Sequence, residues 1–269
     1  MNLLVAILIV LAAGGLAALA LAAVHRKAGG ALLADSGRGR PMIQVTGTVF
    51  AVVLAFVILA AFQTYNNSKA GAQSEAAAVL DMARSAALFP PTQRDQLRAD
   101  LVCYGRAVVE HEWPAMRNGH SSPLVDHWIG AYRAAFGRLD LRSARERLGF
   151  QELLNQAATR SAGRQQRLSN ATPTVPTPLW IALIFGGCVA VVLQLGMADP
   201  SERLRVHGLL FAGLASVVAA GLLIVYFLDH PYQGHTGDIQ PSAMRRTLVM
   251  IENLEPNPPA RCDKSGRPV

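Results

Sequence analysis

Four long stretches without a charged side chain constrain this chain most strongly. They cover residues 3–24, 45–62, 179–197 and 208–228. About 20 residues of α-helix cross the roughly 30 Å hydrocarbon layer of a membrane, and lipid offers no hydrogen-bond partner to a backbone outside a helix or a closed barrel. The sequence therefore predicts an all-α membrane protein with four transmembrane helices, in the inner membrane if the source is bacterial.

Residues 3–24 could also be a cleaved signal peptide. Such a peptide has basic residues ahead of a shorter apolar core, whereas no basic residue precedes this long stretch. We therefore expect a retained span.

Residues 65–177 form the only large polar region, and we expect it to be a helical extramembrane domain. It is rich in Ala, Leu, Arg, Glu and Gln, which favour helices. We predict helices over residues 67–89, 92–117, 123–139 and 141–170, with Thr92 and Asp95 as a capping box and Ser122 as an N-cap before Pro123.

The predicted domains are residues 1–64 (spans one and two), 65–177, 178–228 (spans three and four) and 229–269. The last has a turn, an amphipathic helix over 242–253 with Met244, Leu248 and Ile251 on one face, and a disordered end from Glu255.

Composition and residue spacing argue against several classes of function. The net charge is +7, but no dense basic run exists, so we expect the charge to meet lipid headgroups and not nucleic acid. The three cysteines match no metal or redox motif, and we expect free thiols. The histidines lack metal-site spacing, and no nucleophile–base set or phosphate loop is evident. We therefore expect no metal, no cofactor and no enzyme activity.

Small residues repeat every four positions in the spans, a pattern that lets helices approach closely. One such face is Gly14, Ala18 and Ala22, and another is Ala212, Ser216 and Ala220. On the second span, the face away from Gly47 carries Phe50, Leu54, Val57 and Ala61. In a pore, this face would be a hydrophobic constriction that gates by dewetting. It could equally be a plain lipid-facing or core stripe.

The order of several short motifs resembles the bestrophin-like family, a group of mostly bacterial four-span membrane proteins. The motif positions are Glu75, Tyr104, Glu112, Trp113, Pro114, Asp229, Pro231, Tyr232 and Gly234. The resemblance implies an oligomeric channel for chloride or other anions, because bestrophins are such channels. Bestrophins carry an acidic, calcium-binding run after the last turn, but here only Asp238 stands nearby. We therefore expect no calcium switch.

Two functions remain open from the sequence. One is a homo-oligomeric anion channel with the second span lining the pore, and the other is a membrane-anchored interaction or sensory protein without a pore. If the motif residues are structural, Glu112 should pair with an arginine, Trp113 should pack between helices and Asp229 should accept backbone N–H bonds at the turn.

The number of basic residues near the span ends is almost the same on the two sides of the membrane, so it only slightly favours one orientation of the helical domain. The short loops carry six basic residues near the span ends, namely Arg26, Lys27, Arg38, Arg40, Arg203 and Arg205. The domain side carries seven, namely Lys69, Arg84, Arg160, Arg164, Arg167, Arg245 and Arg246. Because basic residues favour the cytoplasmic side, the margin of one predicts a cytoplasmic domain, as the bestrophin resemblance also does.

Overall fold

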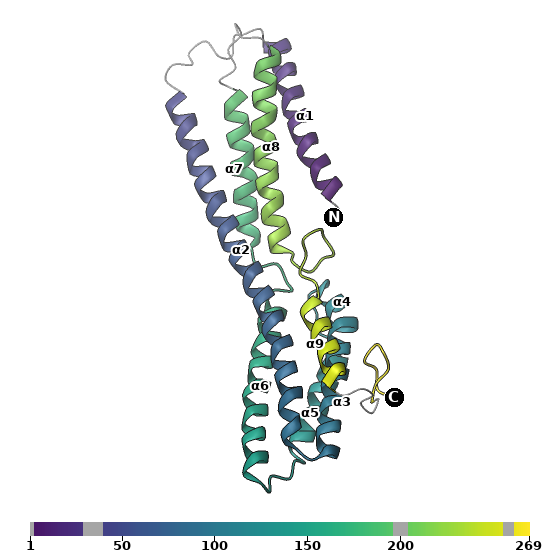
Figure 1. The fold of residues 1–269 in the computed structure, drawn as a ribbon. Coiled ribbons are helices and arrows are strands. Elements are labelled where there is room, and N and C mark those ends of the chain that lie inside the picture. Colours follow the sequence, from purple (N-terminus) through teal and green to yellow (C-terminus); the bar gives the residue numbers. More distant parts are fainter. Residues whose placement is uncertain (1–2, 29–39, 196–203, 255–260) are drawn as a thin grey trace. The chain divides into compact units, whose positions relative to one another are not determined.

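The computed structural model describes residues 3–28, 40–195, 204–254 and 261–269. Within these ranges all regular elements are helices, apart from one isolated β-bridge between Cys262 and Pro268. The elements in chain order are α1 (Leu3–Ala28), α2 (Arg40–Ser85), the 3-10 turn η2 (Ala86–Leu88), α3 (Pro91–Ala107), the π-helical segment η3 (Val108–Glu112), α4 (Trp113–Met116), α5 (Pro123–Phe136), α6 (Ala144–Ser169), α7 (Thr177–Leu195), α8 (Leu204–Asp229) and α9 (Ser242–Leu254). The predicted all-α fold is confirmed (Figure 1).

The chain divides into two compact units. Unit 1 comprises Met1–Thr64 and Pro173–Asp229, and unit 2 comprises Tyr65–Thr172 and His230–Val269. Unit 1 holds α1, the first part of α2, α7 and α8, whereas unit 2 holds the remaining helices. The division along α2 falls between Thr64 and Tyr65.

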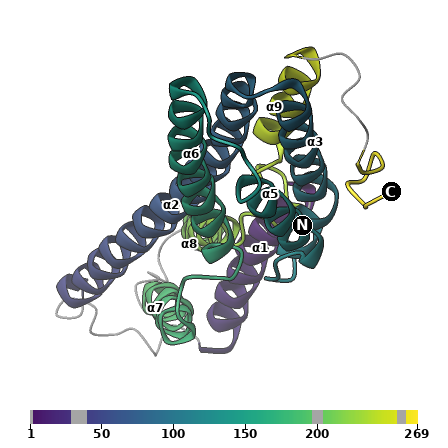
Figure 2. The same cartoon turned by 90° about the horizontal axis from the view of Figure 1, so that it is seen from below.

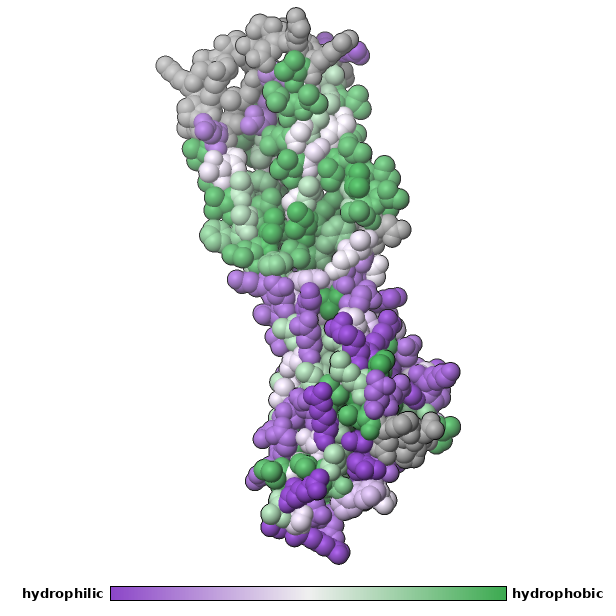
Figure 3. All heavy atoms as spheres, in the orientation of Figure 1, coloured by the Kyte–Doolittle hydropathy of each residue, from purple (hydrophilic) through white to green (hydrophobic). Residues whose placement is uncertain are grey.

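Four helices are long and apolar enough to cross a membrane, as predicted. The qualifying segments are Leu3–Val24, Gln44–Leu88, Thr177–Gln194 and Val206–Asp229. In Figure 3 the visible atoms of unit 1 are mostly hydrophobic, whereas unit 2 shows many hydrophilic side chains. Large aliphatic and aromatic side chains of unit 1 face outward, as expected where lipid is the solvent.

Helices α1 and α8 pack closely along their length through the predicted small-residue faces (Figures 1 and 2). A Cβ added to Gly14 would lie 2.5 Å from the Ser216 hydroxyl oxygen and 3.0 Å from the Ala212 carbonyl oxygen. The Ser216 hydroxyl also donates to the Val10 carbonyl at 3.3 Å. The small side chains therefore bring the two backbones together, as they do at other membrane helix interfaces.

Unit 2 has a conventional apolar core surrounded by helices. Tyr104, Trp128, Tyr132, Met82 and Leu153 are almost fully buried in it. Helix α9 contributes its apolar face to this core. Met244 and Ile251 are buried, and Leu248 lies against Gly105. The amphipathic helix predicted over 242–253 is therefore confirmed, and its apolar face packs against the core of unit 2.

The structure corrects three local predictions. Helix α2 is continuous to Ser85, so no break separates the second span from the next helix. Helix α3 begins at Pro91 without a side-chain cap, and the capping box lies instead at Ser143 and Glu146. The helix expected over 92–117 contains the π-helical segment, which ends two residues before Pro114. Proline has no N–H to donate to the preceding turn, and π-helix occurs mostly as single-turn bulges inside α-helices.

The chain end differs from the prediction of disorder. Residues 255–260 lie outside the described part of the chain, but residues 261–269 are folded against unit 2. Cys262 forms a disulfide with Cys103. The expectation of free thiols was therefore wrong for these two residues, while Cys188 is a free cysteine.

Candidate functional site

Unit 2 contains a buried cluster of charged side chains built from several helices. Glu75 comes from α2, Glu112 from the π-helical segment, and Arg160, Arg164 and Arg167 from α6. The three arginines are spaced four and three residues apart, so they share one face of their helix. Five of the nine family-motif residues are found here. Glu75 and Glu112 belong to the cluster, Tyr104 and Trp113 contact it, and Tyr232 contacts Trp113.

Two glycines allow α6 to approach α2 at this point. A Cβ added to Gly163 would lie 2.7 Å from both the Gly71 carbonyl oxygen and the Glu75 backbone nitrogen. A Cβ added to Gly71 would lie 2.9 Å from the Gly163 carbonyl oxygen. Only glycine at both positions permits this backbone contact, which brings Arg167 within reach of Glu75.

Arg167 lies at the centre of the cluster and is fully buried. Its Nε donates to Glu75 Oε2 at 2.6 Å and its Nη2 donates to Glu75 Oε1 at 2.9 Å, so the pair is bidentate. Nη2 also donates to Glu112 Oε2 at 2.6 Å. The guanidinium carbon lies 4.9 Å from the centre of the Trp113 ring, a cation–π distance. One arginine therefore joins two glutamates and an aromatic ring.

Arg164 forms a second bridge at the edge of the cluster. Its Nε donates to both carboxylate oxygens of Glu112, at 3.1 and 3.2 Å, and its Nη2 also donates to Oε1. Its Nη1 lies 2.8 Å from the exposed Asp126 carboxylate. Glu112 thus pairs with two arginines, as the structural role predicted for it requires.

Arg160 has a different environment from the other two arginines. It is buried between the rings of Tyr104 and Tyr132, with its guanidinium carbon 5.3 Å from each ring centre. Its Nη1 donates to the Tyr104 hydroxyl at 3.4 Å, and that hydroxyl donates to Glu75 Oε1 at 2.5 Å. Its Nε has no partner among the described residues. Arg160, together with Arg133, also lines a cleft of about 660 Å³ between α5 and α6.

The arginines determine the ionisation of this site. Burial alone would raise the pKa of Glu112, but Arg167 and Arg164 outweigh burial and hold that pKa below its ordinary value. Burial, together with the negative charge of Glu75, raises the pKa of Tyr104 well above its ordinary value. Near neutral pH Glu112 is therefore ionised and Tyr104 is a neutral hydrogen-bond donor. Glu75, Glu112, Arg164 and Arg167 therefore form an ion-pair network.

The motif positions around the end of α8 belong to both units: Asp229 lies in unit 1, and Pro231, Tyr232 and Gly234 lie in unit 2. Within unit 1, Asp229 Oδ1 accepts the backbone N–H groups of Thr174 at 2.7 Å and Val175 at 2.9 Å. Asp229 therefore accepts backbone bonds as expected, but from the segment before α7 and not from its own turn.

Within unit 2, the rest of this motif folds against α2 and α4. The Tyr232 hydroxyl hydrogen-bonds the Ser68 hydroxyl at 2.5 Å, and its ring meets the Trp113 ring edge-on. Trp113 Nε1 donates to the Ile239 carbonyl oxygen at 3.0 Å. Pro231 accepts the Ile239 N–H, and Gly234 has a positive φ of 82°. The motif thus forms a compact turn that only glycine closes without strain.

The four residues predicted to line a pore lie on the inner face of α2. Phe50 contacts the glycines of α7 at 186 and 187, and Leu54 contacts Gly221 of α8. Val57 and Ala61 are buried, and Val57 belongs to a small apolar cluster with Leu183 and Val225. In a single chain these side chains therefore pack between helices of unit 1, and the opposite face of α2 is the exposed one.

Comparison with known proteins identifies the family. The Bestrophin-like domain model matches residues 7–244, which is most of the chain. This chain belongs to the bestrophin-like family. The membership predicted from the motif order is confirmed, and it supports a family of ion channels and not of enzymes.

Solved structures show the same fold. A bacterial bestrophin homologue from Klebsiella pneumoniae carrying a leucine-to-threonine mutation superposes with a TM-score of 0.70 at 12% identity, covering 94% of this chain and 99% of the other. Another structure of the Klebsiella pneumoniae homologue gives 0.68 at 14% identity, with the same coverage. A membrane protein carrying a glycine-to-alanine mutation gives 0.69 at 13% identity, covering 92% and 98%. Comparison with curated proteins gave no match.

The sequence of this bestrophin-like protein predicts that Glu112 pairs with an arginine, but it does not show which arginine, and it gives no partner for Glu75. The partners are 52 to 92 residues apart along the chain, so no local spacing links them. One signal in the sequence could have indicated the cluster. Glu75 precedes the apolar run 76–80, so a helix that buries this run also buries the carboxylate, and a buried carboxylate needs a basic partner.

Proposed function

We propose that this protein is a homo-oligomeric ion channel that conducts anions, with the exposed face of α2 lining the pore. The observation that carries the proposal is an exposed, uncharged stripe along α2 in a chain of the bestrophin-like family. The family supports the channel class, and the stripe supports this helix as its lining.

The stripe follows a regular spacing of four and three residues. Its members in unit 1 are Val45, Val49, Val52, Phe56, Leu59 and Gln63, and all are exposed. This is the period of a helix face that meets equivalent helices around a common axis. It replaces the inner face of Phe50, Leu54, Val57 and Ala61 as the proposed lining, because that face is already occupied by α7 and α8.

The chemistry of the stripe fits a gated pore. A ring of Phe56 and Leu59 side chains would make a hydrophobic constriction, which closes by dewetting. Gln63 ends the apolar part, and the same spacing continues through Asn66 and Gln73, both exposed. Their amide groups offer N–H donors to a passing ion.

Anions are the proposed ions for two electrostatic reasons. No acidic residue stands on the stripe from Val45 to Gln73, whereas cation-selective pores commonly use rings of Asp or Glu. The chain also carries a net charge of +7, which raises the local concentration of anions.

Flux from liposomes tests this proposal with a matched pair of variants. Phe56 and Phe185 are 67% and 69% exposed on α2 and α7. We expect the wild-type protein to release chloride, Phe56→Ala to release it faster because the constriction is wider, and Phe185→Ala to behave as wild type. No chloride flux from the wild type, or equal effects of both substitutions, would contradict the proposed lining.

The alternative is a membrane-anchored interaction or sensory protein without a pore. Such a protein needs no closed ring and would leave the α2 stripe in contact with lipid. The two functions therefore differ in oligomeric state as well as in flux. A monomer or dimer in mild detergent, together with silent liposomes, would favour the alternative.

A further inference from the structure

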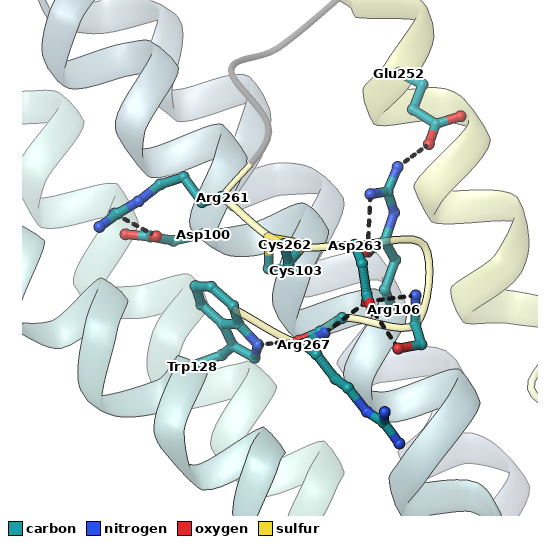
Figure 4. Close-up of a disulfide and its surroundings, with 11 residues drawn as sticks. Asp100, Cys103, Arg106, Trp128, Glu252, Arg261, Cys262, Asp263 and Arg267 are labelled. Atoms are coloured by element: carbon teal, nitrogen blue, oxygen red, sulfur yellow. Dashed lines mark hydrogen bonds and ion pairs between the residues drawn. A yellow bond between two sulfur atoms is a disulfide. The ribbon is translucent and has the colours of Figure 1, made fainter. Parts of the chain in front are cut away.

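The disulfide and the chain end together form a clasp on unit 2, which we define as residues 261–269 (Figure 4). Cys262 and Cys103 are both buried in the core of this unit. Trp128 Nε1 donates to the Gly266 carbonyl oxygen at 2.7 Å, and Arg261 Nη1 lies 2.7 Å from the buried Asp100 carboxylate. The clasp is thus anchored by a covalent bond, a hydrogen bond and an ion pair.

The clasp also fits its surface closely. A Cβ added to Gly266 would lie 2.5 Å from the Ala107 backbone nitrogen, and this glycine has a positive φ of 85°. Asp263 Oδ1 accepts the backbone N–H groups of Ser265 and Arg267 at 2.8 and 2.9 Å. The loop is therefore preorganised to hold Cys262 against Cys103, 159 residues away in the sequence.

A disulfide of this kind indicates an oxidising compartment. Cytosolic thiols are kept reduced by glutathione and thioredoxin, so stable structural disulfides are found mainly outside the cytosol. Forming the bond removes two protons and two electrons from the two thiols. The electrons pass by thiol–disulfide exchange to a disulfide-bearing oxidant, which is reduced to its dithiol.

The structure also changes the count of basic residues on the domain side. Arg160, Arg164 and Arg167 were counted there because they precede the third span in sequence. Arg160 and Arg167 are buried, and Arg164 is engaged with Glu112 and Asp126. In the folded protein these three side chains are therefore not available to anionic lipid, which leaves Lys69, Arg84, Arg245 and Arg246 on the domain side.

The short loops keep their full count. Six basic residues, Arg26, Lys27, Arg38, Arg40, Arg203 and Arg205, lie between spans one and two or between spans three and four. The positive-inside rule applies to loops of up to roughly 60 residues, and longer domains are translocated largely regardless of charge. The loops are short, whereas residues 65–172 exceed that length. The six basic residues of the short loops, against four near the span ends on the domain side, favour a cytoplasmic position of the short loops.

From these two independent observations we infer that unit 2 lies on the oxidising, non-cytoplasmic side of the membrane, with the short loops in the cytoplasm. This is opposite to the orientation that the initial charge count and the bestrophin resemblance predict. The clasp would then close only after unit 2 has crossed the membrane and met the oxidant.

Cysteine labelling in intact bacterial cells tests the orientation in the full-length protein. In a Cys188→Ser background, one variant carries Gln151→Cys on the exposed side of α6 and another carries Ser201→Cys in the loop between spans three and four. We expect a membrane-impermeant maleimide to label Gln151→Cys in intact cells, and to label Ser201→Cys only after permeabilisation. Both variants must label in permeabilised cells, and any other pattern in intact cells overturns the inference.

The state of the native cysteine pair provides a second measurement. Cells are quenched with acid and the denatured protein is treated with a polymer-linked maleimide, which reacts only with free thiols. We expect the Cys188→Ser protein to remain unmodified unless it is first reduced, and to gain two adducts in a host that lacks its extracytoplasmic thiol oxidase. Two adducts in the normal host would overturn the inference even if the protein folds and conducts.

Discussion

The two units of this protein are stabilised in contrasting ways. The described core of unit 1 consists of small, aliphatic and aromatic side chains, Phe211 among them, with Asp229 as its one buried charged residue. Among its described residues, unit 2 buries six charged ones: Glu75, Arg98, Asp100, Glu112, Arg160 and Arg167. Helices in lipid gain little from burying apolar surface and depend on close contact of small residues. A domain in water has apolar burial to drive folding and can use buried ion pairs to fix how its helices meet.

The largest predicted effect concerns the centre of the charged cluster. Arg167→Ala leaves the carboxylates of Glu75 and Glu112 buried without their shared partner, and we expect it to lower the free energy of unfolding by about 3–5 kcal/mol. Thermal unfolding of the purified protein in mild detergent measures this. Arg142→Ala is the control, because its pair with Asp140 is 85% and 50% exposed and exposed pairs contribute about 0–1 kcal/mol. Equal losses would show that burial is not the relevant difference.

The clasp should have the next largest effect. Cys262→Ser removes a crosslink across 159 residues, and we expect a loss of about 2–4 kcal/mol, typical of disulfides. Reduction of the wild-type protein should lower its unfolding temperature to about that of the variant. Reduction should leave the unfolding of Cys262→Ser unchanged. A reducing agent that affects both equally would contradict the assignment.

Close helix contacts provide a comparison between the units. Gly163→Ala in unit 2 places a methyl group against backbone atoms of Gly71 and Glu75, and we expect a loss of about 1–3 kcal/mol from overpacking. Gly14→Ala in unit 1 meets first the Ser216 hydroxyl, which can rotate, so a smaller loss is expected. Gly47→Ala meets no atom within 4 Å and should be close to neutral. A larger loss for Gly14→Ala than for Gly163→Ala would reverse this order.

The pH dependence of stability should be the smallest effect. The pKa of Glu112 is lowered in the folded protein, so its contribution is fully present above its unfolded pKa of about 4.3 and is lost as the pH falls through the folded pKa. Stability should therefore decrease in acid. Glu112→Gln should be less stable near neutral pH, with a shallower decrease below about pH 4 to 5. An unchanged acid slope in this variant would argue against the assigned pKa.

The membrane half of the fold could be predicted from the sequence because hydropathy and span length are local properties. The four spans followed from composition and length, and the small-residue faces of α1 and α8 followed from four-residue spacing, but that spacing did not show that these two faces meet. The charged cluster could not be predicted, because Arg167 meets Glu75 from 92 residues away. The packing of Phe50 and Leu54 against the glycines of α7 and α8 could not be predicted either, because both faces of α2 are apolar in the sequence.

Imaging of single particles in lipid nanodiscs tests the proposed channel most directly. We expect a closed ring of four or more chains with the stripe from Val45 to Gln63 facing a central axis and Phe56 at its constriction. A monomer, a dimer, or a ring in which this stripe faces lipid would contradict it.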